Sequence, residues 1–233
     1  SKQKGRAIRY NKKFMPDSRY VSLKNLIKTG NIISKAFAFY EVPFKQDVFD
    51  NATFQQTQMN FYATITNLNT AQAEYVKLTD PLAQMEVLRA TSAMPYVSMP
   101  VEINGVPYLD GAIADSIPLE QMKKMGYDKI IVVLTRTLDY RKSKPNPLLA
   151  KLWYRKYLKF ADAVNNRYAM YNKQVENVIE QAEKGEIFVI RPSVDLNIKR
   201  IEKDPNKLQA MYDLGVSDMQ REWENLQVFL ATS

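Results

Sequence analysis

The 233-residue sequence contains no cysteine and no histidine. Without cysteine, the chain can form no disulfide, thiol nucleophile or thiolate metal site. Without histidine, it can form no Ser-His-Asp triad of its own and few zinc or iron sites. A hydrolase with this composition needs a carboxylate, a lysine or a tyrosine as its general base. We therefore expect neither a metal nor a cofactor.

Long apolar runs are also lacking. The longest strand-like run is Ile130 to Leu134, far short of the roughly 20 apolar residues that a membrane-spanning helix needs. With 45% hydrophobic residues over 233 positions, the chain is long enough for one domain with a sizeable core. The sequence shows no internal repeat or linker that would define a second domain, and it does not indicate an oligomeric state.

Positive charge is in excess and is concentrated in two segments. Residues 1–50 carry eleven Lys and Arg against four acidic residues, and residues 136–160 carry eight against one. Such segments are typical of contact with an anionic membrane surface or nucleic acid, or are solvated helix faces. We do not expect nucleic acid as the partner, because the sequence holds no zinc-ligand pattern, RNA-recognition signature or clear helix-turn-helix.

The most informative stretch runs from Ala90 to Pro118, ATSAMPYVSMPVEINGVPYLDGAIADSIP. Asn104-Gly105 between apolar residues predicts a tight hairpin turn. The returning strand, Val106 to Leu109, leads directly into Asp110 and then Gly111-Ala112. An aspartate at a strand end, with glycine allowing close backbone packing behind it, is suited to be a catalytic base. The alternative interpretation is a turn aspartate that caps its own backbone.

The strings ATSAMP and PVEINGVPYLDGAIADSIPL within this stretch resemble the second conserved block of patatin-like phospholipases. The resemblance is clear from about Asn60 to Thr135. By position, Asp110 matches the aspartate of the family's Ser–Asp catalytic dyad, with Gly111 and Ala112 as supporting residues. The resemblance implies an α/β fold of three layers, in which helices flank a central, mostly parallel sheet. It also implies a lipid or acyl-ester substrate.

The family's nucleophile lies in a G-x-S-x-G elbow that follows a glycine-rich oxyanion loop, and neither motif occurs in these residues. Gly215-Val216-Ser217-Asp218-Met219 lacks the second glycine and lies in a predicted helix, whereas Ser92 has no elbow glycines. Ser1 to Arg6 looks like the sequence that follows the elbow helix in bacterial members. We therefore expect that the N-terminal portion with the nucleophile is missing and that this chain alone is inactive.

The remaining patterns predict the other elements. Residues 1–20 are expected to continue a helix that began before Ser1 and to become a loop at Pro16-Asp17-Ser18. Gly30 is expected to divide residues 20–39 into two short helical pieces, in a region that often lines or covers the site in the resembled family. Residues 130–135 form a continuous β-branched run, typical of a parallel strand buried on both faces. Further elements are expected as strands at 60–67, 73–78 and 186–191, and as helices from Asp80-Pro81, from Pro118 with Ser116 as its cap to Gly126, and at 148–160, 162–184 and 206–230.

Together these patterns lead to one interpretation of the whole chain. Residues 1–233 are expected to be the larger, C-terminal part of a single patatin-like domain, with a helical extension from about residue 145. The function implied is a serine lipid acyl hydrolase, a phospholipase or esterase, of which the chain holds only Asp110. The alternative is a catalytically inactive interaction or membrane-binding protein of the same fold. We expect the protein to be cytoplasmic or peripheral at a membrane.

Overall fold

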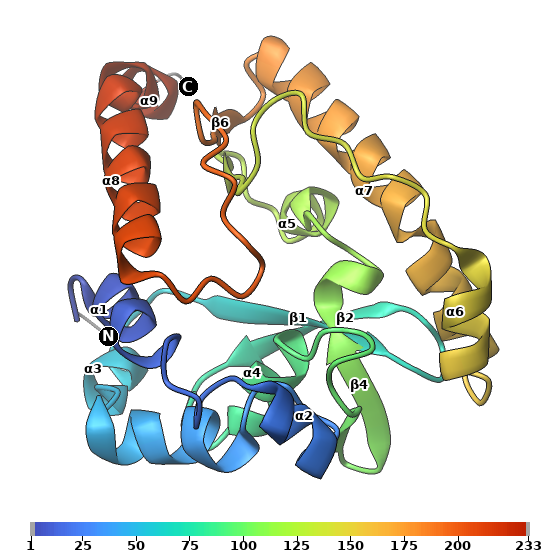
Figure 1. Ribbon diagram of the computed structural model, residues 1–233. Helices are drawn as coiled ribbons and strands as arrows, with labels where there is room; N and C mark the ends of the chain where they lie inside the picture. The colour runs from blue at the N-terminus through green and yellow to red at the C-terminus, as the bar shows by residue number, and fades with distance from the viewer. Residues whose placement is uncertain (1–2, 232–233) are drawn as a thin grey trace. The chain divides into compact units, whose positions relative to one another are not determined.

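The computed structural model describes residues 3–231 (Figure 1). The chain forms two compact units, the first from Ser1–Ser116 with Lys144–Arg167 and the second from Ile117–Ser143 with Tyr168–Ser233. Helix α7 (Leu158–Glu183) contributes residues to both units. A mixed α/β fold is confirmed. A single domain with a helical extension from about residue 145 stays a prediction.

The first unit is built on a four-stranded sheet in the order β2-β1-β4-β3, in which every pairing is antiparallel. The prediction of a mostly parallel central sheet is therefore wrong for this sheet. Short turns join β1 to β2 and β3 to β4, and such connections permit only antiparallel pairing. The strands are β1 (Phe61–Asn67), β2 (Ala73–Leu78), β3 (Val101–Ile103) and β4 (Val106–Asp110), the first two as the sequence predicts.

The hairpin between β3 and β4 is confirmed. Asn104 and Gly105 both have positive φ, 52° and 78°, as a two-residue turn of the twist-compatible type requires. The hairpin packs Tyr108 and Leu109 into the main core of the first unit. Because Leu109 is fully buried, the direction of the next residue, Asp110, is fixed by the alternation of the strand.

The helices of the first unit differ from the predictions mainly in where they begin. Helix α1 (Arg6–Phe14) starts after Gly5, whose φ is 72°, so it does not continue from before Ser1. Gly30 ends α2 (Leu23–Thr29) as predicted, but the second piece, η1 (Lys35–Gln46), is a π-helix containing Pro43. The other helices of this unit are α3 (Asn51–Gln55), α4 (Met85–Thr91), the 3-10 helix η2 (Gly111–Ile113) and α6 (Pro147–Trp153).

The predicted starts of two helices need correction. The carboxylate of Asp80 accepts the N–H of Ala83, as a helix cap would, but residues 81–84 form a turn and α4 begins only at Met85. Ser116 does not cap α5 (Leu119–Lys124), because its hydroxyl donates to the carbonyl of Ala112. Gly126, with a φ of 82°, follows the end of α5 as predicted.

The second unit contains a parallel pair, β5 (Ile131–Val133) with β6 (Phe188–Ile190). Burial of β5 on both faces was predicted and is wrong, because Val132 is buried whereas Val133 is 69% exposed. Only β6 pairs with β5 among residues 3–231, and only one face of β5 packs on the unit's core. The predicted C-terminal helix is interrupted at Glu222 between α8 (Pro205–Arg221) and α9 (Trp223–Ala231).

No helix within residues 3–231 combines the length and apolar character needed to cross a bilayer.

Candidate active site

Asp110 is the last residue of β4, and short contacts fix it on both sides. Its backbone N–H donates to the carbonyl of Ala93 at 3.0 Å. One oxygen of its carboxylate accepts the N–H of Ala112 at 2.9 Å. The side chain is half-buried. The aspartate therefore caps its own turn, as the alternative interpretation expects, and this same hydrogen bond orients the carboxylate that the catalytic interpretation needs.

Gly111 lies against the backbone of β1. A Cβ atom built on Gly111 would stand 2.2 Å from the carbonyl oxygen of Thr64, far inside any allowed contact. The hydroxyl of Thr91 donates to that same carbonyl at 2.7 Å. Only glycine therefore permits the turn after Asp110 to approach β1 this closely, which gives a physical reason for the Asp-Gly pair.

Three side chains hold the turn after Asp110, and the sequence analysis singled out only one of them, Ser116, which it expected in another role. The buried hydroxyl of Thr66 donates to the carbonyl of Asp110 at 2.8 Å. The carbonyl of Ala112 accepts Nε of Arg167 at 2.8 Å and the hydroxyl of Ser116 at 2.7 Å. No local pattern indicates Arg167, which lies 55 residues further along the chain. The sequence could have suggested a structural role for Thr66, because it is a small polar residue in a predicted strand.

The two serines considered as nucleophiles do not take that role in this geometry. The hydroxyl of Ser92 donates to the carbonyl of Leu88 at 2.5 Å, so it completes the end of α4. Ser217 lies within α8 of the second unit. Neither residue lies on the strand-to-helix turn that exposes a serine nucleophile in an elbow. Among residues 3–231 there is also no group of three or more acidic side chains placed to hold a metal ion.

An apolar cavity of about 540 Å³ lies in the first unit. Thr91 and Ser92 contribute to its wall, and Thr91 also contacts the carbonyl of Thr64 against which Gly111 packs. Thr91 and β1 thus lie between this cavity and the Asp110 turn, and Asp110 is not among the residues that line the cavity. Its lining is mostly aromatic and aliphatic: Arg6, Ala7, Tyr10, Asn11, Ala38, Phe39, Pro43, Phe49, Phe54, Phe61, Pro81, Leu82, Met85, Leu88, Thr91 and Ser92.

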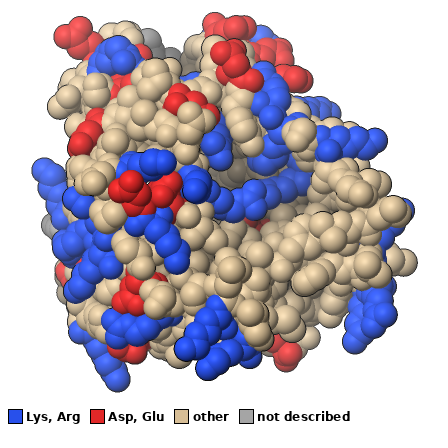
Figure 2. Space-filling view, viewed as in Figure 1, with Lys and Arg blue, Asp and Glu red and all other residues tan. Residues whose placement is uncertain are grey.

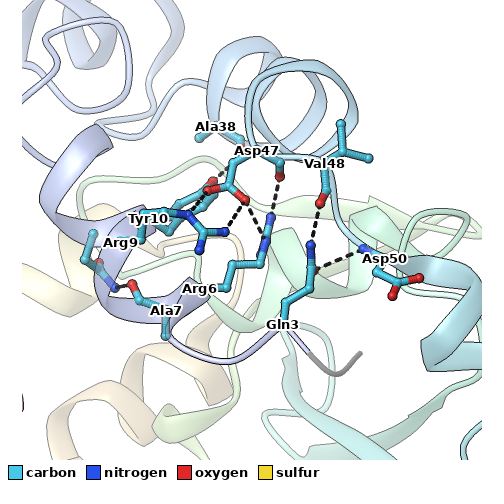
Figure 3. Close-up of polar contacts among 10 residues, drawn as sticks. Gln3, Arg6, Ala7, Arg9, Tyr10, Ala38, Asp47, Val48 and Asp50 are labelled. Carbon is cyan, nitrogen blue, oxygen red and sulfur yellow. Dashed lines mark hydrogen bonds and ion pairs between the residues drawn. The ribbon is translucent and has the colours of Figure 1, made fainter.

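One wall of this apolar cavity is held by Asp47, at the end of η1 (Figure 3). Its carboxylate accepts hydrogen bonds from Arg6 and Arg9 of α1, each at 3.1 Å. The hydrogen bond from Arg9 holds the pKa of Asp47 below its usual range. Tyr10 donates from its hydroxyl to the carbonyl of Ala38 at 3.0 Å, and burial raises its pKa. These contacts fix α1 on η1.

Helix α6 presents apolar side chains to solvent. Leu148 is 71% exposed and Leu152 is 75% exposed, and Trp153 is exposed beside them. We call this surface the α6 patch, made of Leu148, Leu149, Leu152, Trp153 and Leu158 with the exposed cations Lys151, Arg155, Lys156 and Lys159. On the face drawn in Figure 2, Lys and Arg likewise border broad uncharged areas. Large exposed apolar groups among cations are typical of a contact surface.

Two known sequence families match parts of this chain. The sequence profile of the family described as patatin-like phospholipase matches residues 3–123, more than half of the chain. The chain therefore belongs to the patatin-like phospholipase family. A second profile, described as a domain of unknown function (DUF6363), matches residues 157–231.

A curated relative matches a shorter segment. The "Uncharacterized protein YjjU" of Escherichia coli (strain K12) is 36% identical over 52 residues, which are 22% of this chain. The matched segment spans 15% of that relative's length.

Proposed function

We propose that the intact protein is a serine lipid acyl hydrolase in which Asp110 is the general base. The observation that carries the proposal is the Asp110 turn itself. A half-buried carboxylate is oriented by the Ala112 N–H and backed by a glycine that nothing larger can replace. It stands in the block that matches the patatin-like phospholipase family.

The chemistry follows from the two partners that such a site needs. A serine hydroxyl, carried outside these 233 residues, attacks the ester carbonyl while Asp110 takes its proton. The carboxyl then returns the proton to the departing alcohol, leaving an acyl-enzyme. Water, deprotonated by Asp110 in turn, attacks that ester and releases the fatty acid. The proton passes from Asp110 to the departing serine oxygen, which restores both groups. Backbone N–H groups stabilise the oxyanion in both halves.

We propose that the apolar cavity of the first unit holds the acyl chain. Its volume, about 540 Å³, lies within the range of small-molecule sites, about 300–1,000 Å³. Its lining offers aromatic faces and few polar groups, which suits a hydrocarbon chain and disfavours a charged head group. Its polar groups are the side chains of Arg6, Asn11, Thr91 and Ser92 and the hydroxyl of Tyr10, which donates to the carbonyl of Ala38.

We further propose that the α6 patch attaches the protein to an anionic membrane surface. Leucine and tryptophan side chains can enter the interface between head groups and acyl chains, while the neighbouring lysines and arginines contact anionic lipids. This arrangement would bring a lipid hydrolase to its substrate and would place it at the periphery of a cytoplasmic membrane surface.

The role of Asp110 as the base is tested in the protein that the full reading frame containing this sequence encodes. Asp110→Asn keeps the shape of the side chain but cannot accept the proton, so we expect kcat on a short-chain ester to fall by about 100-fold or more. Asp162→Asn, which changes an exposed aspartate of α7, is the matched control and should retain activity. Activity that survives Asp110→Asn removes Asp110 as the base. The 233-residue chain alone should be inactive.

The alternative function is a catalytically inactive, membrane-binding protein of this fold. The α6 patch favours it independently of Asp110, because the patch needs no nucleophile to bind lipid. Co-sedimentation with anionic vesicles tests the patch: Leu152→Asp should lose binding, whereas Val228→Asp, at an exposed position of α9, should not. Equal binding by both variants rejects the patch. A reading frame without G-x-S-x-G, combined with vesicle binding, favours the inactive alternative.

A further inference from the structure

A second cavity, of about 460 Å³, lies in the second unit. It opens where β5 and β6 end, next to Leu134 and Arg191. Parallel strands of α/β proteins place ligands beyond their carboxyl ends. The apolar part of its lining includes Val194, Met211 and Leu214.

Four cations border this basic cavity: Arg136, Arg191, Lys199 and Arg200. Within residues 3–231, no carboxylate lies within ion-pair distance of any of them. Of the two acidic residues in the lining, buried Asp218 accepts a hydrogen bond from Arg221 at 2.7 Å, and Asp195 accepts the backbone N–H of Asn197 at 2.8 Å. The lining therefore holds four cations and two carboxylates, neither of which pairs with these cations, and the cavity carries an excess of positive charge.

Arg191 points to a ligand most directly. Its Nη1 atom is buried and has no hydrogen-bond partner in the described part of the chain. Leaving a charged donor unpaired in this way is costly, and such a group normally meets water or a bound ion. Desolvation lowers the pKa of Arg191, and Arg141 adds to this effect, so the guanidinium gains from any anion that approaches it.

We propose that this cavity binds the phosphate group of an amphiphilic phosphate ester. Guanidinium groups match the oxygens of phosphate in pairs of parallel hydrogen bonds, which the Arg191 and Arg136 side chains can supply. The apolar part of the ester fits against Val194, Met211 and Leu214, which line the same cavity. The site lies within the second unit and does not depend on Asp110 or on hydrolysis.

Titration calorimetry of the full chain tests the site with two soluble probes, inorganic phosphate and n-butyl phosphate, at constant ionic strength. We expect saturable binding of both, with butyl phosphate the tighter because its alkyl group is buried. Arg191→Gln should weaken both probes by about tenfold or more. Absence of saturable binding overturns the proposal, and equal affinity for the two probes overturns its apolar part.

Two further variants keep the test decisive. Arg200→Gln alters an exposed cation of the cavity and should fold normally while weakening phosphate binding. Lys24→Gln removes one positive charge from an exposed position of α2 in the first unit, outside the α6 patch, and is the matched control. Equal effects of Arg200→Gln and Lys24→Gln would mean that general positive charge, not this cavity, attracts phosphate. Circular dichroism identifies any variant that fails to fold.

A vesicle experiment distinguishes a lipid head group from a soluble phosphate ester as the ligand of this cavity. Phosphatidylcholine vesicles with phosphatidic acid present the same monoester as a lipid head group. If Arg191→Gln reduces binding to these vesicles as it does to butyl phosphate, the ligand is a lipid. If only the soluble probe is affected, the ligand is a soluble phosphate ester. Either result supports the phosphate site. If the calorimetry shows no phosphate site at all, the proposal that Asp110 is the base of a hydrolase is unaffected.

Discussion

The cavity of the first unit, about 540 Å³, is lined by aromatic and aliphatic side chains, whereas that of the second unit, about 460 Å³, is bordered by four cations. Their sizes are close, so volume cannot assign their ligands. The apolar lining favours hydrocarbon, and the unneutralised cations favour an anion. The backbones differ too: a hairpin-built antiparallel sheet supports the first cavity, and a single parallel pair supports the second.

The largest expected effect compares the packing around one glycine in each unit, Gly111 and Gly215. Gly111→Ala should destabilise the protein by about 3 kcal/mol, because the new methyl group would collide with the backbone of Thr64. Gly215, on α8 at the wall of the basic cavity, has open space around it. Gly215→Ala should instead stabilise by about 0.5–1 kcal/mol, since alanine favours helix. Urea unfolding measures both, and similar losses would contradict the difference in packing.

The ion pairs of Asp47 come next in expected size. Asp47→Asn should lower the free energy of unfolding by about 1–2 kcal/mol. The loss is smaller than for a fully buried ion pair, because the Arg9 side chain is 53% exposed and water screens its charge. Glu180→Gln, which breaks an exposed pair with Lys184, should have no measurable effect. Chemical unfolding at pH 7 compares the two variants. A loss as small for Asp47→Asn as for Glu180→Gln would contradict the role given to this contact.

The ion pairs of Asp47 also predict how the stability of the folded protein depends on pH. Because folding lowers the pKa of Asp47, the carboxylate stabilises the folded protein fully above the unfolded-state value, about pH 3.9. This contribution is lost as the pH falls through the lowered pKa. The difference in stability between the native protein and Asp47→Asn should therefore be constant near neutral pH and shrink below about pH 4. A difference that grows on acidification would contradict the assignment.

A further test compares how the two cavities bind a hydrocarbon chain. The fluorescent fatty acid cis-parinaric acid should bind in the apolar cavity, and Leu88→Lys should weaken it by about tenfold, since a buried ammonium opposes the chain. Leu214→Lys makes the same change in the basic cavity and should leave the affinity unchanged. If Leu214→Lys weakened the probe equally, the two cavities would not differ in chemistry as their linings suggest.

The sequence predicted those features that depend on neighbouring residues. Asn104-Gly105 determines its own turn, and the step from strand to Asp110 follows from it. The close approach at Gly111 could also be anticipated, because glycine after a strand-end acid suggests a neighbouring backbone. What could not be predicted is the partner: the carbonyl of Thr64 and the side chain of Arg167 come from distant parts of the chain.

The mistakes have the same origin. The run 130–135 is apolar enough for a buried strand, but burial depends on which strands flank it, and only β6 pairs with it in the part described. Likewise, Asp47 pairs with Arg6 across 41 residues, so no local pattern indicates the cavity wall. The phosphate site went unpredicted because its cations are separated by more than 50 positions, from Arg136 to Arg191.

The smallest expected effect concerns β5 and defines how the second unit differs from the first. Val133→Thr should change stability by less than about 0.5 kcal/mol, because the side chain is 69% exposed. Val132→Thr, one residue earlier and buried, should cost about 1–2 kcal/mol, since its hydroxyl would enter the core. Urea unfolding of the two variants provides the comparison. A loss above about 1 kcal/mol for Val133→Thr would require this strand face to be covered in solution, and the second unit would then be as enclosed as the first.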